Sequence, residues 1–446
     1  MNEHTYESLR IVDYPLRIAA TPAKRQFFLR KKIHVYLTLS VIATTLFSWF
    51  NINSYLIILL LACRLLDGRP YNNLKTAFTN KYFLAWFSIF LLDFIGLFYT
   101  HHFFTGWKHM ESKATLVAIP FILTAGPFTD NTGYRRLLSA YCLLLAGTCL
   151  YCLSMAVVQY HWQHDDSVFF YHALSSAVSV NAVFFSGYLI VALLFLLFSP
   201  FPAVTSPLLR RVLILFFTGM MILLSSKLLL VLLTVIFFFY LAGRNPLRLK
   251  KWYLFGLGLL ITAGIMTLAL TDNPVGRRYR EILPDEQLNT LSQPAFNGVS
   301  IRLLMWQYAW QILNEQHAWV FGVSAGDSQE LLDQKYLAAG MSQGYLRYDF
   351  HNEYIEVLVR SGIVGGFIFI LAIALLIDMA RFAGTIEAGF TIALLLLVLL
   401  TESALEMQHT LFLFSFFPLL TGTRRQAMRR ASALNFRPLF GSKGLS

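Results

Sequence analysis

Two short runs of residues in the second half of the chain have types and spacing that could carry out chemistry. Arg302 and Trp306 lie one helical turn apart, and His351-Asn352-Glu353-Tyr354 follows after a polar stretch. Further cations in the same region are Arg277, Arg278, Arg280 and Arg347. Guanidinium groups bind phosphate oxygens in pairs, and a neutral histidine accepts a proton near neutral pH. These residues suit group transfer from a phosphate-linked donor, although arginines that anchor to lipid headgroups and a histidine that caps a helix would explain them too.

The rest of the chain is strongly apolar. Its 446 residues are 57% hydrophobic and only 13% charged. Because long apolar runs in lipid must satisfy their own backbone hydrogen bonds, we expect an all-α, polytopic membrane protein with about 12 transmembrane helices. The predicted spans are 33–50, 54–66, 82–99, 114–126, 137–158, 176–198, 210–225, 227–242, 252–270, 361–379, 387–405 and 409–422. Three of them, 54–66, 114–126 and 409–422, are short enough to be half-helices or re-entrant segments.

The positions of the basic residues predict the orientation. Most of the 36 lysines and arginines fall on one side of the predicted spans, and short loops rich in these residues stay on the cytoplasmic side. The chain is expected to comprise a cytoplasmic N-terminal segment (1–32), helices 1–9 (33–270), a loop facing the periplasm or the cell exterior (271–360), helices 10–12 (361–422) and a basic cytoplasmic tail (423–446). No cleavable signal peptide is apparent, because the first apolar run follows a long polar segment.

Composition argues against several other functions. The net charge of +12 is spread over membrane-flanking segments, which does not suit nucleic-acid binding. The cysteines Cys63, Cys142, Cys149 and Cys152 fall in predicted spans, and although Cys149 and Cys152 have the spacing of a redox pair, we interpret them as apolar side chains. The histidines occur on two separate outer loops at His101, His102, His109, His161, His164 and His172 without tight ligand spacing, so no metal or other cofactor is assigned.

The predicted loop, of about 90 residues, is far longer than a connection between two membrane helices requires, so it is expected to be functional. Its pattern predicts a helix from Ser300 to Asn314, a glycine-punctuated turn from Trp319 to Asp327, and a second helix over 328–339. On the first helix Arg302 and Trp306 share a face. His351 then lies where the chain re-enters the membrane.

The order of these motifs resembles the O-antigen ligase and polymerase superfamily of bacterial envelope proteins, over roughly residues 205–422. The matching residues are Arg302, Trp306, Gly322, Gly326, Asp327, His351, Asn352, Tyr354, Gly362, Ile363 and Gly365. Thr401-Glu402-Ser403-Ala404-Leu405-Glu406 also resembles the end of the family's penultimate helix.

The resemblance implies a metal-independent glycosyltransferase of the bacterial inner membrane. It would transfer a glycan from undecaprenyl diphosphate to a sugar hydroxyl of lipid A-core, with membrane lipids around it. His351 would be the general base and Arg302 would hold the diphosphate, assisted by Arg277, Arg278 or Arg280. Lys227 stands where the family tends to carry arginine, so it either binds phosphate without the bidentate fork or extends its amine to the membrane surface. Supporting residues would be Trp306, Asn352, Tyr354, Glu402 and Glu406, the two glutamates either orienting His351 or an acceptor or capping the interface.

Several functions stay open at this point. Within the family the same motifs serve O-antigen ligation, polysaccharide polymerisation and glycan transfer to protein, and we favour ligation because the predicted loop is single and the histidine motif matches well. A transporter or flippase of a lipid-linked or anionic solute is an alternative of another class. It would carry more ionisable residues within its spans, where Asp93 is the main one here.

Overall fold

The chain folds entirely into helices in the part that the structure, a computed structural model, describes. The described residues are 22–66, 70–124, 131–199, 206–244 and 300–435, with the single positions 204 and 298. The predicted span 252–270 lies outside these ranges, and so do Arg277, Arg278 and Arg280. No strand occurs within the described ranges, which confirms the predicted all-α class.

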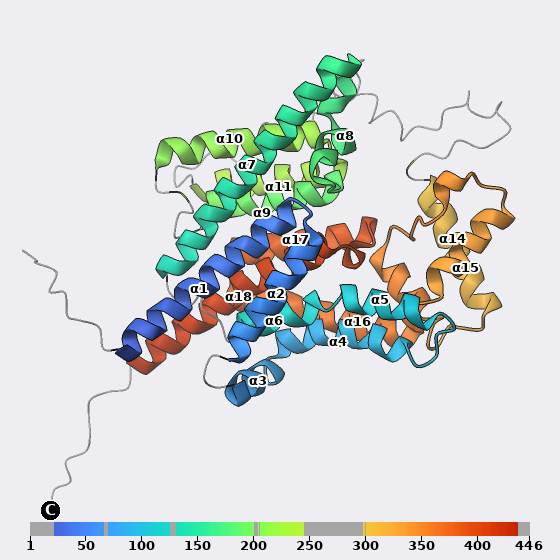
Figure 1. Ribbon diagram of the computed structural model, residues 1–446, viewed down its shortest axis with the longest axis horizontal. Helices are drawn as coiled ribbons and strands as arrows, with labels where there is room; N and C mark the ends of the chain where they lie inside the picture. Colours follow the sequence, from blue (N-terminus) through green and yellow to red (C-terminus); the bar gives the residue numbers. More distant parts are fainter. Residues whose placement is uncertain are drawn as a thin grey trace, which may run out of the picture.

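Helices occupy eleven of the twelve predicted spans (Figure 1). In chain order the α-helices are α1 (Pro22–Leu46), α2 (Phe50–Leu65), α3 (Pro70–Phe78), α4 (Lys81–Gly96), α5 (Phe103–Ser112), α6 (Thr115–Thr124), α7 (Asn131–Gln163), α8 (Tyr171–Ser175), α9 (Ala182–Phe198), α10 (Pro207–Leu224), α11 (Lys227–Arg244), α14 (Ser300–Glu315), α15 (Ser328–Ala338), α16 (Glu353–Ala383), α17 (Ile386–Thr401) and α18 (Gln408–Asn435). Short 3-10 helices are η1 (Asp166–Phe169), η2 (Ser176–Val178), η4 (Gln343–Tyr345) and η5 (Ala404–Glu406).

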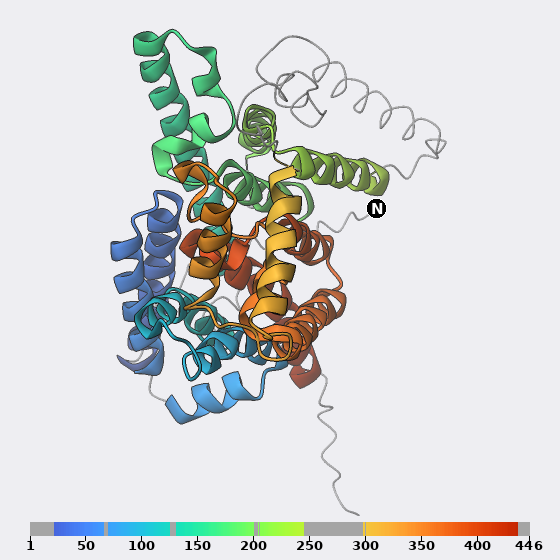
Figure 2. The ribbon, with the colours of Figure 1, turned by 90° about the vertical axis from the view of Figure 1, so that its right-hand side faces the viewer.

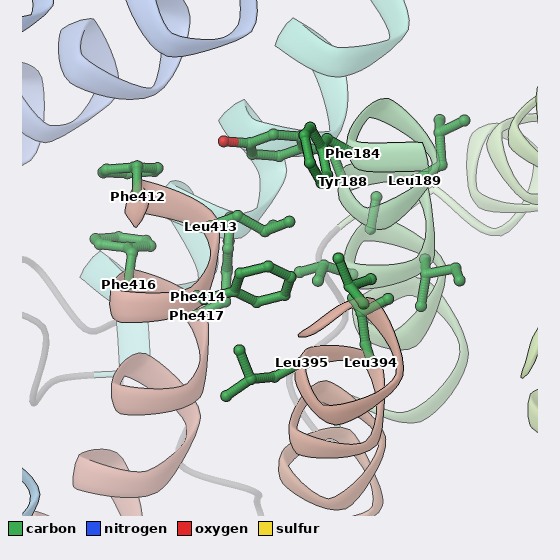
Figure 3. Close-up of a cluster of buried hydrophobic side chains, with 14 of the residues drawn as sticks. Phe184, Tyr188, Leu189, Leu394, Leu395, Phe412, Leu413, Phe414, Phe416 and Phe417 are labelled. Carbon is green, nitrogen blue, oxygen red and sulfur yellow. The ribbon is translucent and has the colours of Figure 1, made fainter. Parts of the chain in front are cut away.

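The core forms around α9, which is apolar on all sides and almost completely buried. Figure 3 shows Tyr188 of α9 extending toward Leu413 of α18, with Leu394 of α17 in the same cluster. The Tyr188 hydroxyl donates a hydrogen bond to the backbone oxygen of His409, so the one polar atom of this ring has a partner. The cluster joins the middle of the chain to the two helices that flank Glu402.

Several of the described helices are shorter than a membrane crossing requires. Three described helices are long and apolar enough to cross a membrane, Gly133–Gln163, Pro207–Leu224 and Glu353–Ala383, and two bent helix pairs raise the number to five. Other apolar helices, such as α2 with 16 residues, measure about 24 Å, against the roughly 30 Å of hydrocarbon in a bilayer. The described residues therefore contain three to five candidate spans, and the total of about twelve stays a prediction.

The helices of the predicted loop lie together at one end of the molecule. The predicted helix from Ser300 is confirmed as α14 and the second as α15, and Figures 1 and 2 show both beyond the ends of α4, α5 and α16. They enclose a small apolar core of their own that includes Met305, Leu332 and Phe350. α16 begins at Glu353, eight residues before the predicted span, so His351 immediately precedes a helix.

Candidate active site

Three residues from distant parts of the chain meet at one carboxylate. Oε2 of Glu402 lies 3.1 Å from Nδ1 of His351, and Oε1 of Glu402 lies 3.0 Å from a terminal guanidinium nitrogen of Arg302. Glu402 is the residue at which α17 ends, and its side chain is only 7% exposed. The side chains of His351 and Arg302 are 27% and 31% exposed, so both stay accessible to a ligand.

The backbone around His351 fixes the direction of its ring. His351 has a φ of 46°, in the left-handed region that a residue other than glycine rarely adopts. Its N–H donates to Oδ1 of Asp349, and the next residue, Asn352, caps α16 by accepting from the N–H groups of Tyr354 and Ile355. The Asn352 amide also donates to the backbone oxygen of Leu400, which connects this turn to the end of α17.

The contact with Glu402 determines which ring nitrogen of His351 can act. An ionised carboxylate only accepts hydrogen bonds, so Nδ1 carries the proton and Nε2 is left with a free lone pair in the neutral ring. Burial by itself lowers the pKa of the imidazole, but the hydrogen bond to Glu402 and the charges of Asp349 and Glu402 outweigh it. The positive charge of Arg302 opposes them, and the net result is a raised pKa for His351.

Trp306 supports the site without reaching His351 directly. Its indole N–H donates to the backbone oxygen of Phe350, and Arg302 on the same face of α14 donates to the backbone oxygen of Gly298. α14 therefore contacts the turn that carries His351 through Trp306 and the end of α17 through Arg302, from positions one helical turn apart.

The glycines of the Gly-x-x-x-Gly turn and of α16 meet where two segments cross. α16 is broken at Gly362, with a φ of 62° and a ψ of −165°, and the backbone oxygens of Val359 and Arg360 accept instead from the N–H groups of Val323 and Ser324. A Cβ on Gly362 would lie 2.3 Å from the backbone of Val320, and one on Gly322 would lie 2.3 Å from the backbone of Arg360. Only glycine fits at either position.

Asp327, the last residue of that motif, binds a different loop. Its carboxylate accepts from the N–H groups of His101 and His102 at 2.9 and 3.0 Å and from the hydroxyl of Thr100 at 3.2 Å. Burial raises the pKa of Asp327, but these hydrogen bonds more than offset it and the pKa lies below its usual value. The aspartate therefore connects the loop after α4 to the start of α15.

The other predicted residues lie apart from the Glu402 carboxylate. Tyr354 packs edge-on against Phe369 within α16. Lys227 is the first residue of α11, and α11 packs on α17, the helix that ends at Glu402. The carboxylate of Glu406 pairs with His109, Lys113 and Arg360 rather than with His351. Within the described ranges, no three His, Cys, Asp or Glu side chains are arranged to hold a metal ion.

Glu406 belongs to a group of ionisable side chains that we call the buried charge network. Its members are Asp93, Lys113, Glu353, Glu356, Arg360 and Glu406, each 9% exposed or less. Of these residues, the sequence motifs and predicted spans pointed only to Asp93 and Glu406. A signal was nonetheless present, because Glu353, Glu356 and Arg360 recur at the spacing of one helix face, directly after His351.

Comparison with known proteins agrees with the motif order. Residues 212–370 match the family model described as O-Antigen ligase. That range includes Lys227, Arg302 and His351 and ends before Glu402, whose place at the site rests on the geometry described above. No curated protein matches the chain significantly.

Proposed function

We propose that this chain, whose residues 212–370 match the O-antigen ligase family model, is a membrane glycosyltransferase of the O-antigen ligase superfamily that acts at the periplasmic face. The donor would be a glycan on undecaprenyl diphosphate, and the acceptor a sugar hydroxyl of lipid A-core. The observation that carries this proposal is the Glu402 carboxylate shared by His351 and Arg302. It supports the presence of a base and a phosphate-binding cation side by side.

The proposed reaction makes one bond and breaks one. Nε2 of His351 takes the proton of the acceptor hydroxyl, whose oxygen bonds to the anomeric carbon of the donor sugar. The bond from that carbon to the diphosphate breaks, and the diphosphate leaves with both electrons. Glu402 holds the ring through Nδ1 and stabilises the imidazolium that forms, as the third member of a catalytic triad does. Arg302 stabilises the charge of the leaving diphosphate.

This assignment is tested by glycan transfer in vitro with purified protein and purified undecaprenyl diphosphate-linked glycan. We expect His351→Ala to lower the rate by about 10²- to 10⁴-fold, the range for loss of a positioned base. His161→Ala, an exposed histidine at the end of α7, is the matched control and should leave the rate unchanged. A folded His351→Ala variant with wild-type transfer would remove the base assignment.

Three acceptors tested in parallel distinguish the family's activities. Product on lipid A-core would establish ligation, extension of a second repeat unit would establish polymerisation, and product on a protein acceptor would establish protein glycosylation. The buried charge network is a feature that the transporter alternative would also predict. Movement of lipid-linked substrate across proteoliposomes without glycan transfer would favour that alternative.

Lys227 is proposed to bind the diphosphate together with Arg277, Arg278 or Arg280. Lys227→Ala should raise KM for the donor about tenfold, in the range of one charge-assisted phosphate contact, and Lys227→Arg should be tolerated. Steady-state kinetics at varied donor concentration measure this. Wild-type KM in both variants would indicate that the amine only extends to the membrane surface.

A further inference from the structure

The short segment 402–406, which joins α17 to α18, is held at almost every residue. The Ser403 hydroxyl donates to Glu356 at 3.2 Å, the N–H of Leu405 donates to Glu353 at 2.9 Å, and Thr410 donates to the backbone oxygen of Ala404. These contacts come mainly from the first two turns of α16. The segment thus connects the buried charge network to Glu402, the carboxylate that binds His351.

Glu406 makes the strongest contacts of the segment. Nζ of Lys113 lies 2.9 Å from its Oε1 and 2.9 Å from Asp93 on α4, and Arg360 bridges the same Oε1 to Glu356, 2.7 Å away. Lys113 and Arg360 are each only 3% exposed. A buried cation is costly unless paired, and these two are paired on both sides.

The place of Glu406 in the chain links its ion pairs with Lys113 and Arg360 to Glu402. The two cations bind the carboxylate four residues beyond Glu402, in a segment that does not continue the helix. A shift of Glu406 therefore moves the backbone that carries Glu402, and a hydrogen bond of 3.1 Å to His351 weakens steeply with such a shift. Both cations lie outside the Glu402 site itself, so neither touches a reacting atom.

We propose that Lys113 and Arg360 are positioning residues, whose ion pairs with Glu406 hold the segment 402–406 so that Glu402 stays against His351. The inference rests on the proposed function for its kinetic consequence. Whether these ion pairs hold Glu402 against His351 is a separate question, and the Glu402–His351 contact can be measured even in a protein without transferase activity.

A double-mutant cycle between Lys113→Met and Glu402→Gln tests the proposal. If Lys113 acts through Glu402, Lys113→Met should lower kcat about tenfold in the wild-type background, a coupling typical of residues in one network, and should have little further effect in Glu402→Gln. It should also move the acid limb of the pH–rate profile to lower pH. The charged groups that face His351 are Glu402, Asp349 and Arg302, and of these only Glu402 belongs to the held segment.

The control is Lys81→Met, which removes the exposed ion pair of Lys81 with Asp378 at the far end of α4 and α16. It should change neither kcat nor the position of the acid limb. Equal losses from Lys113→Met in both backgrounds, or an unmoved acid limb, would overturn the proposal. If Lys113→Met does not fold, the pair Asp93→Asn/Lys113→Met replaces it, because no aspartate is then left without its cation.

A titration of His351 by NMR, with labelled histidine and His351→Ala for assignment, separates the two proposals. If the wild-type protein transfers no glycan, the proposed function fails, and the titration still decides the inference. A lower His351 pKa in Lys113→Met supports the positioning role, and an unchanged pKa contradicts it.

Discussion

At the scale of single residues, Glu402 determines what His351 can do. It accepts from Nδ1, which leaves Nε2 as the free base, and its charge favours the imidazolium. A raised pKa has two opposing effects on a general base. It makes the base stronger, and it leaves a smaller fraction of the ring unprotonated at low pH.

Glu402→Gln separates these effects. The amide cannot stabilise the imidazolium as the carboxylate does, so the pKa of His351 should fall and the acid limb of the pH–rate profile should move to lower pH. The maximal rate should fall as well, because a weaker base removes the acceptor proton less readily. Transfer rates measured from about pH 5 to 8, the interval in which histidine changes its charge, give both quantities.

Glu111→Gln removes an exposed carboxylate on α5 and serves as the control, with an expected profile like that of the wild type. An acid limb that stays in place in Glu402→Gln would show that Glu402 does not set the protonation of His351.

The sequence identified Arg302 and His351 as candidates from their types and motif order. It could not single out Glu402, which was one of two carboxylates with open roles, because Glu402 lies 51 residues from His351 and 100 from Arg302. Such contacts depend on how α14, α16 and α17 pack. One unaligned sequence specifies the apolar faces of those helices but not their mutual register.

At the scale of elements, the break in α16 is the feature that aligns the site. The segment 319–324 supplies N–H groups to carbonyls that the break at Gly362 leaves free, and the crossing connects the outer helices to α16. The motif spacing flagged Gly362 but predicted a helix starting there. The structure places the start at Glu353 instead. Asn352 caps the helix there, and N–H groups of Val323 and Ser324 donate to the carbonyls that the break leaves free.

Gly362→Ala should therefore lower stability by at least about 1–3 kcal/mol, since its backbone conformation is essentially restricted to glycine. Gly366→Ala, one turn further along the same helix, is the matched control: its Cβ would lie 3.9 Å from the nearest atom, and removing a helical glycine should raise stability by about 0.5–1 kcal/mol. Unfolding of the purified proteins in detergent measures both. Equal stability of the two variants would contradict the role assigned to the crossing.

At the scale of the whole molecule, α4 and α16 run in opposite directions and define two ends. Lys81 at the start of α4 pairs with Asp378 near the end of α16, whereas Gly96 at the end of α4 lies beside Ser324, close to the break in α16. Figure 1 accordingly shows α3 at one end and α14 with α15 at the other. The basic residues of the sequence predict that the first end is cytoplasmic and the second periplasmic.

Cysteine labelling tests that orientation. Ser342→Cys, an exposed position after α15, should react with a membrane-impermeant maleimide in intact spheroplasts, and Thr76→Cys, exposed on α3, should react only after permeabilisation. The wild-type protein should react little, because Cys142, Cys149 and Cys152 are buried and Cys63 is partly buried. Labelling of Thr76→Cys in intact spheroplasts would indicate the opposite orientation. His351 and Arg302 would then face the cytoplasm, where a periplasmic acceptor could not reach them.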